Sequence, residues 1–212
     1  MTIASRLAGL AGLLLFGAGA PAGATALLVH VSDAAGKPLP DVVLVAEPEG
    51  GALPKFLKPA EIEQRGLKFL PLVSVVQTGS RVSFPNNDKV KHHIYSFSPA
   101  KKFDQKLYSG VAATPQVFDK AGTVVLGCNI HDRMIAYIKV VDSPFFGKTD
   151  SAGAVRIELP AAGKYTVTAW HYNMAGAVAE QLAAVGAGDT TLGFKLALKP
   201  PALDDGDSGK PN

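Results

Sequence analysis

Cysteine and tryptophan each occur only once in the 212 residues, and methionine occurs three times. A single cysteine excludes an internal disulfide, so a disulfide framework does not hold this chain together. Charged residues are few and nearly balanced, with 21 Lys and Arg against 18 Asp and Glu. This balance gives no indication of a nucleic-acid partner. The longest apolar run, residues 7–20, is too short for a comfortable transmembrane helix, so no stable membrane span is expected.

The amino-terminal segment has the features of a secretory signal peptide. Arg6 precedes the apolar run, and Ala22-Gly23-Ala24 offers a small-residue cleavage site. We therefore predict that residues 1–24 are a signal peptide and that the mature chain is periplasmic or secreted.

Beyond the leader, the chain consists of short apolar and β-branched runs separated by turn residues. The predicted strands are residues 27–31, 42–46, 72–77, 82–84, 92–97, 103–108, 116–118, 123–126, 135–141, 154–159, 165–170 and 194–198. This pattern predicts an all-β fold of the Greek-key β-sandwich type.

Three segments do not follow the strand pattern. Residues 59–64 are expected to form a short helix in an irregular connection. The Ala-rich residues 175–187 suit a short helix or a long loop, and their glycines favour a loop. Residues 200–212 are rich in Pro, Gly and Asp, and we predict a disordered tail.

The single cysteine begins a compact group of soft donors, Cys128-x2-His131-x2-Met134. A lone Cys is more often an inert buried thiol or a reactive thiol, but its spacing to His131 and Met134 favours a metal ligand. A thiolate and two imidazoles with a weak thioether form the donor set of blue-copper sites. The second imidazole would come from His92 or His93. Neighbouring strand residues face opposite ways, so only one of the two is expected to bind.

Residues 66–141 resemble the cupredoxins, the blue copper family that includes the plastocyanins and amicyanins. The resemblance is carried by Phe69-x-Pro71, Gly79-Ser80-Arg81-Val82-Ser83-Phe84, Asn86-x-Asp88 with His92 four residues later, residues 122–126, and Cys128-x2-His131-x2-Met134. The short ligand loop is similar to that of amicyanin, and residues 84–99 resemble exported plastocyanin-like proteins described as methylamine utilisation proteins. A cupredoxin domain over residues 62–142 is therefore expected.

The resemblance implies one type 1 copper ion and assigns its ligands. Cys128 would supply the thiolate, His131 the second equatorial ligand and Met134 the weak axial ligand. His92 aligns with the remaining family histidine. The alternation of His93, Tyr95 and Phe97 on one apolar face favours His93 instead, and the resemblance gives the residue after the ligand histidine the role of tying the two ligand loops together.

The flanks resemble the two halves of a carboxypeptidase-regulatory-like, Ig-like β-sandwich. The matching pieces are Val31-x-Asp33-x2-Gly36-x-Pro38-Leu39-x2-Val42, Thr149-Asp150-x2-Gly153 and Leu159-Pro160-x2-Gly163-x-Tyr165-x-Val167. Residues 26–52 plus 146–199 would then form a discontinuous domain with the cupredoxin inserted in one of its loops. One continuous, larger sandwich is the alternative.

These features lead us to expect an exported one-electron carrier and no enzyme. Its partners would be a donor oxidoreductase and an acceptor such as a c-type cytochrome. Five histidines without a His-x-His motif do not provide for a trinuclear copper cluster. The alternatives are a copper-binding module for storage, delivery or sensing, and a structural sandwich with a vestigial site. The lysines clustered in residues 89–106 are either a solvated face or a docking patch for an acidic redox partner.

Overall fold

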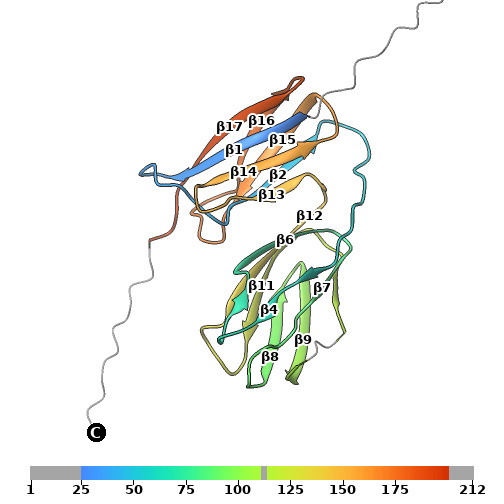
Figure 1. Cartoon of the computed structure of the whole chain (residues 1–212), viewed down its shortest axis with the longest axis vertical. Helices are drawn as coiled ribbons and strands as arrows, with labels where there is room; N and C mark the ends of the chain where they lie inside the picture. Colours follow the sequence, from blue (N-terminus) through green and yellow to red (C-terminus); the bar gives the residue numbers. More distant parts are fainter. Residues whose placement is uncertain (1–24, 111–113, 201–212) are drawn as a thin grey trace, which may run out of the picture.

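The computed structural model describes residues 25–110 and 114–200, and these residues form strands, turns and loops without a helix (Figure 1). The all-β class predicted from the strand pattern is therefore confirmed. The strands gather into two groups, each with its own hydrophobic core. Both the predicted signal peptide and residues 201–212 of the predicted tail lie outside the described residues.

One group, called here the flanking sandwich, uses strands from both ends of the described chain. One of its sheets has the order β14-β1-β17, and the other has the order β13-β2-β15-β16. Its strands are β1 (Thr25–Asp33), β2 (Val43–Pro48), β13 (Phe146–Lys148), β14 (Ala154–Leu159), β15 (Gly163–Trp170), β16 (Ala179–Val185) and β17 (Asp189–Leu196). Alternate residues of β15 are buried, including Tyr165, Val167 and Ala169, because every second side chain of a strand faces the core. The likeness of this sandwich to a carboxypeptidase-regulatory-like domain stays a prediction.

The prediction of a loop at residues 175–187 is wrong, because β16 occupies most of this segment. β16 pairs antiparallel with β15 along its whole length, from Ala179 opposite Ala169 to Val185 opposite Gly163. Ala183 and Val185 are buried. Two-residue periodicity in this segment is weak, since its outward side includes the apolar Leu182. The strand therefore depends on its partner β15 and not on local propensity.

The other group, called here the central sandwich, is formed by the chain between the two segments of the first, and Figure 1 shows it beside the flanking sandwich. Its largest sheet has the order β6-β12-β11-β8-β9, and β10-β7-β3 and β4-β5 form smaller sheets. Its strands are β3 (Ala60–Glu61), β4 (Glu63–Gln64), β5 (Phe69–Leu70), β6 (Val73–Gln77), β7 (Ser80–Ser83), β8 (His92–Ser98), β9 (Lys101–Tyr108), β10 (Gln116–Phe118), β11 (Gly122–Cys128) and β12 (Ile135–Val141). β8, β11 and β12 have alternating burial, with one face on the core.

The short helix predicted for residues 59–64 is also wrong. The segment is extended, and Ala60 pairs with Val82 while Gln64 pairs with Phe69. Ile62 and Gln64 are fully buried, whereas Glu61 before them is exposed and Glu63 between them is partly exposed. This is the two-residue period of a strand, carried by too few residues to be distinguished from a helical turn by sequence.

The two sandwiches pack against each other through β2 of the flanking sandwich. Leu44 and Ala46 face the core of their own sandwich, while Val43 and Val45 join Val73 in a separate buried cluster. β2 is thus buried on both faces, which explains its unbroken apolar run. Lys148 reinforces the contact, because its Nζ atom lies 2.6 Å from Oδ1 of Asp41 and donates to the carbonyl of Val73 at 2.9 Å.

Within the described ranges, no helix is long and apolar enough to cross a membrane.

Candidate metal centre

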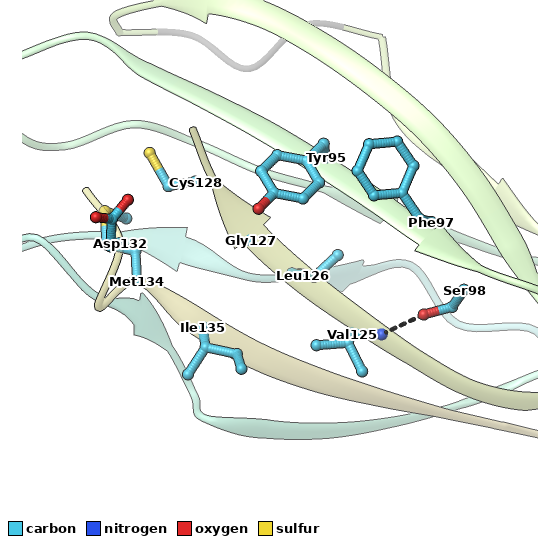
Figure 2. Close-up of a pocket in the computed structure, with 10 residues that line it drawn as sticks. All are labelled: Tyr95, Phe97, Ser98, Val125, Leu126, Gly127, Cys128, Asp132, Met134 and Ile135. Carbon is cyan, nitrogen blue, oxygen red and sulfur yellow. Dashed lines mark hydrogen bonds between the residues drawn. The ribbon is translucent and has the colours of Figure 1, made fainter. Parts of the chain in front are cut away.

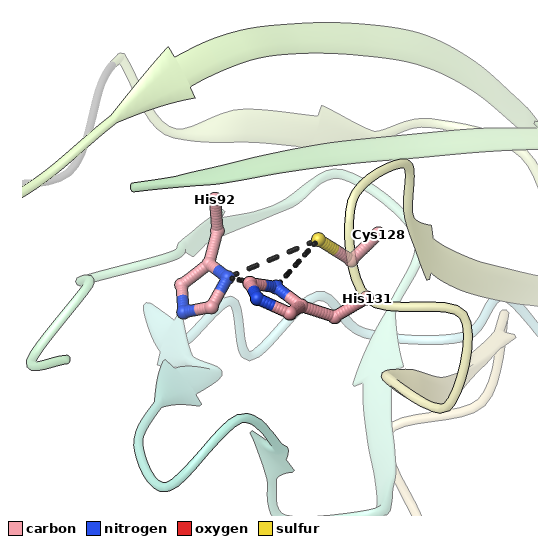
Figure 3. A group of neighbouring side chains, drawn as sticks. All are labelled: His92, Cys128 and His131. Atoms are coloured by element: carbon pink, nitrogen blue, oxygen red, sulfur yellow. Dashed lines mark hydrogen bonds between the residues drawn. The ribbon is translucent and has the colours of Figure 1, made fainter. Parts of the chain in front are cut away.

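Three of the four predicted ligands meet at one end of the central sandwich. His92 begins β8, Cys128 ends β11, and His131 lies in the loop between β11 and β12. β8 and β11 are adjacent antiparallel strands, and Ile94 is opposite Cys128 in their register. The sheet therefore brings His92 to Cys128 across 36 residues of sequence, and the loop folds His131 back onto both (Figure 3).

The three side chains direct one nitrogen or sulfur atom each toward a common point. Sγ of Cys128 is 3.8 Å from Nδ1 of His92 and 3.8 Å from Nδ1 of His131, and the two Nδ1 atoms are 3.2 Å apart. His92 and Cys128 are buried, at 0% and 3% exposure, while His131 is partly exposed. The site is closed on the protein side and reaches the surface at His131.

These distances fit a metal ion placed among the three atoms. A point equidistant from all three lies about 2.1 Å from each, which matches the ~2.0–2.3 Å bonds that nitrogen and sulfur make to zinc in proteins. The donors are a thiolate and two imidazoles in a trigonal arrangement, the combination that selects copper with a weak fourth ligand. The donor set of this chain therefore fits copper.

Asp88 fixes the orientation of the His92 ring. Its Oδ2 atom lies 2.8 Å from Nε2 of His92, so a proton on Nε2 leaves Nδ1 free to bind a metal. Asp88 is itself held by the backbone N–H groups of Gly66 at 2.6 Å and Leu67 at 3.1 Å. Burial alone would raise the pKa of the Asp88 carboxyl, but the hydrogen bonds from His92 and these two N–H groups lower it below its ordinary value. The Asp88 carboxylate therefore stays charged and accepts a hydrogen bond from the Nε2–H group of His92.

His93 points to the other face of the sheet. Its Nε2 atom bonds to the carboxylate of Asp104, and its ring packs edge-on to that of Tyr95 at 6.4 Å between centroids. The buried side chains of β8 are His92, Ile94 and Ser96. The apolar alternation that favours His93 is therefore misleading, because Tyr95 and Phe97 lie on the outer face.

The two ligand-bearing segments are tied together through backbone atoms. The N–H of Asn129, which follows Cys128, donates to the carbonyl of His93 at 3.2 Å. The tie expected from the residue after the ligand histidine is present, but the backbone of His93 makes it and the imidazole does not.

Met134 closes the ligand loop. Its N–H donates to the carbonyl of His131 at 2.9 Å, and its side chain is 2% exposed. Cys128 and Met134 belong to the same buried cluster and line the same pocket (Figure 2). The Met134 side chain is thus buried in the same cluster as Cys128, and its axial role stays a prediction.

Two polar residues near the site, Gln64 and Tyr108, belong to none of the sequence motifs that predict the site. Gln64 donates through Nε2 to the hydroxyl of Tyr108 at 2.6 Å and to the carbonyl of Phe84 at 3.0 Å, and Tyr108 also donates to that carbonyl. Tyr108 is opposite His92 in the β8–β9 pairing. Burial raises the pKa of Tyr108 to about 12, although the hydrogen bond from Gln64 opposes the rise. Tyr108 therefore remains a neutral donor beside the His92 strand.

The other two histidines lie in the flanking sandwich. His30 is exposed on β1, and His171 is buried just after β15. Within the described residues, the group of potential metal ligands consists of His92, Cys128 and His131.

Comparisons with known proteins give similarity at the level of structure. No protein-family model matches the chain, and no curated protein matches its sequence. One similar structure is a Cu-containing nitrite reductase from Thermus scotoductus, at 24% identity and a TM-score of 0.37 over 44% of this chain and 25% of that one. A purple cupredoxin from Nitrosopumilus maritimus matches at 22% identity and a TM-score of 0.35, over 38% of this chain and 98% of that one. Amicyanin from Paracoccus versutus matches at 16% identity and a TM-score of 0.36, over 46% of this chain and 96% of that one. The chain thus spans a quarter of the nitrite reductase it matches.

Proposed function

We propose that this protein is a one-electron carrier with a single type 1 copper ion bound by His92, Cys128 and His131, with Met134 as the axial ligand. The observation that carries the proposal is the triangle formed by Sγ and the two Nδ1 atoms, whose sides of 3.8, 3.8 and 3.2 Å suit one ion bound to all three. A bound copper ion would supply a centre that accepts and releases one electron.

The residues around the site suit a carrier because they hold the ligands in one geometry. His92 is fixed by Asp88, and Cys128 is fixed by its place at the end of a paired strand. Ligands held in a packed core move little when the charge of the site changes. We propose no catalytic role for the protein.

His131 is the ligand best placed for exchange of electrons with a partner. It is partly exposed, and its neighbour Ile130 is 47% exposed. A partner that covers this loop would approach the centre through one imidazole. In keeping with the predicted signal peptide, we propose that the carrier works in the periplasm or outside the cell. Its partners there would be a donor oxidoreductase and an acceptor such as a c-type cytochrome.

Copper storage, delivery or sensing is the second candidate, and the exposure of His131 also favours it. A ligand that another protein can reach is where copper would be handed over. The two functions differ in kinetics: a carrier exchanges electrons rapidly and keeps its copper, whereas a delivery protein loses copper to an apo-acceptor.

The test of the proposal is the visible absorption spectrum of the mature protein after addition of cupric ion, beside a Cys128→Ser variant. A carrier of this type gives an intense thiolate-to-copper band that a reductant bleaches and that the variant lacks. A colourless protein that binds cupric ion only weakly would show that Cys128 is a buried thiol and that the proposal is wrong.

A further inference from the structure

The five-stranded sheet of the central sandwich has an outer face that its own core does not use. Part of this face, on β6 and β12, packs against the flanking sandwich through Val73 and Tyr137. The remaining part, on β8, β9 and β11, is called here the open face. Its outward side chains are His93, Tyr95, Phe97, Lys102, Asp104, Lys106 and Val125.

Apolar side chains are exposed on the open face, where Phe97 is 76% and Val125 38% exposed. At the border of this face, the first residue of β12, Ile135, is 42% exposed. With Tyr95 and Gly127 they line a groove of about 530 Å³ (Figure 2). A contiguous apolar surface of this kind, unlike scattered single residues, marks a contact surface.

The groove lies directly beside the proposed ligand Cys128. Gly127 precedes Cys128, and the Tyr95 ring covers it so closely that a Cβ atom on Gly127 would lie 2.8 Å from the ring. The Tyr95 and Phe97 rings are 5.1 Å apart between centroids. An aromatic pair therefore runs from the backbone next to the thiolate to a side chain that is mostly in solvent.

Lysines supply positive charge on the β9 side of the aromatic pair, while Asp132 lines the groove near Cys128 and Met134. Lys102 is directly opposite Phe97 in the β8–β9 register, so their side chains share a face. Lys106 is also exposed on that strand, while the carboxylate of Asp104 is bonded to His93. Lysines on an edge strand such as β9 also prevent edge-to-edge pairing, which explains them without a partner. Edge protection does not explain an exposed Phe97, so a basic rim around an apolar centre is the better description.

We propose that the open face docks an acidic redox protein, which places its apolar contact area on Phe97 and Val125 and its carboxylates on Lys102 and Lys106. This inference rests on the proposed electron-carrier function for the identity of the partner as a redox protein. Complementary charge would speed the encounter, and the aromatic centre would supply most of the affinity.

The test compares two c-type cytochromes of similar size and opposite net charge. The ¹⁵N-labelled mature chain is titrated with each at low ionic strength, both metal-free and loaded with cuprous ion, and its amide signals are followed by NMR. With the acidic cytochrome, the amides of Tyr95, Phe97, Lys102 and Val125 should shift, and added salt should reverse the shifts. The basic cytochrome should leave these signals in place.

Matched variants locate the contact. Phe97→Ser should weaken binding of the acidic cytochrome at least about fivefold, as expected for a central interface residue. Lys102→Glu should also weaken binding, because the substitution places like charges opposite each other at the rim. Leu182→Ser and Lys195→Glu make the same changes at exposed positions of the flanking sandwich and should leave it unchanged.

Several results would overturn the docking proposal. Shifts confined to residues 129–133, equal binding of both cytochromes, or no binding of either would each show that the open face is not the acidic partner's site. Shifts that grow with the concentration of the chain alone would identify a second copy as the occupant. Because binding is read without the copper band, intact docking with a colourless cupric form would instead refute the proposed function.

Discussion

Nε2 of His92 lies 2.8 Å from Oδ2 of Asp88, while Nδ1 of the same ring faces Sγ of Cys128 at 3.8 Å. The hydrogen bond from Nε2 to Asp88 thus orients the ring so that Nδ1, without a proton, faces the candidate metal site. His93, the next residue, makes the corresponding bond to Asp104 on the opposite face of β8. The strand therefore carries two histidine–carboxylate pairs, of which only one adjoins the candidate centre.

The two pairs provide a matched experiment on copper affinity. Asp88→Asn removes the charge that holds the His92 ring, and we expect copper affinity to fall about 10–100-fold, the usual effect of losing a group that orients a ligand histidine. Asp104→Asn makes the same change beside His93 and should leave copper affinity unaltered. Competition with a chelator of known affinity measures both variants. Equal losses in the two variants, or none in Asp88→Asn, would contradict the orienting role.

The histidines themselves give a second prediction. His92→Gln should abolish the thiolate-to-copper absorption because it removes one of two imidazole donors. His93→Gln should keep the absorption and lower the free energy of unfolding by less than about 1 kcal/mol, since the bond it removes is an exposed one. Visible spectra and denaturant unfolding distinguish the two, and retention of the band in His92→Gln would exclude His92 as a ligand.

Met134 is expected to tune the reduction potential more than the stability of the protein. Met134→Leu should keep the copper and raise its potential, because the axial thioether is a weak donor that favours the cupric form. A Met to Leu exchange in a core conserves volume and should cost less than about 1.5 kcal/mol in the free energy of unfolding. Voltammetry measures the potential, with Met174→Leu in the flanking sandwich as the control. Equal potentials in the native protein and Met134→Leu would show that Met134 only fills the core.

Site residues that are close together in the sequence could be predicted from it, whereas those brought together from distant segments could be predicted only in part. Cys128 and His131 are three residues apart in one loop, so their spacing alone indicates a shared site. His92 follows only from the resemblance, and Asp88 was noted there without its contact to the His92 ring. Gln64 and Tyr108 gave no signal, because their contacts to Phe84 depend on how three distant segments pack.

The strand pattern predicted the fold wherever a strand alternates or is uniformly apolar. β8, β12 and β2 are of this kind. The pattern does not predict β3, β4 and β16, because pairing with another strand holds each of them: β3 pairs with β7, β4 with β5 and β16 with β15. Residues 60–64 are also too few to show a period. Propensity describes a strand poorly when tertiary pairing decides its state.

Two of the flanking-sandwich glycines with positive φ, Gly36 and Gly153, differ in how tightly they are packed. Gly153 has φ +69°, and a Cβ atom there would lie 2.4 Å from the carbonyl oxygen of Val31; Gly36 has φ +89° and open space. Gly36→Ala should therefore cost only the ~1–2 kcal/mol of the left-handed conformation. Gly153→Ala adds a clash with backbone atoms and should lower the free energy of unfolding by about 2–5 kcal/mol. Denaturant unfolding measures both, and equal costs would show that the turn at Gly153 relaxes freely.

Acidification should destabilise the flanking sandwich through His171. Burial lowers the pKa of His171 below its ordinary value of 6.5, opposed in part by the nearby charge of Asp41, and its Nδ1 accepts a hydrogen bond from the N–H of Asn173 at 3.2 Å. Between the lowered pKa and 6.5 the unfolded chain binds more protons than the folded one, so stability rises with pH in that window. The contribution of neutral His171 to the free energy of unfolding is complete above pH 6.5 and is lost as the pH falls through the folded-state pKa. For one group, this loss is no more than ~1.4 kcal/mol per pH unit. The effect is measured by the denaturant midpoints of the native protein and of His171→Asn between about pH 5 and about pH 7.5, a range that crosses the ordinary pKa of 6.5. The variant should lose part of the pH dependence, and an unchanged slope would show that His171 does not titrate with folding.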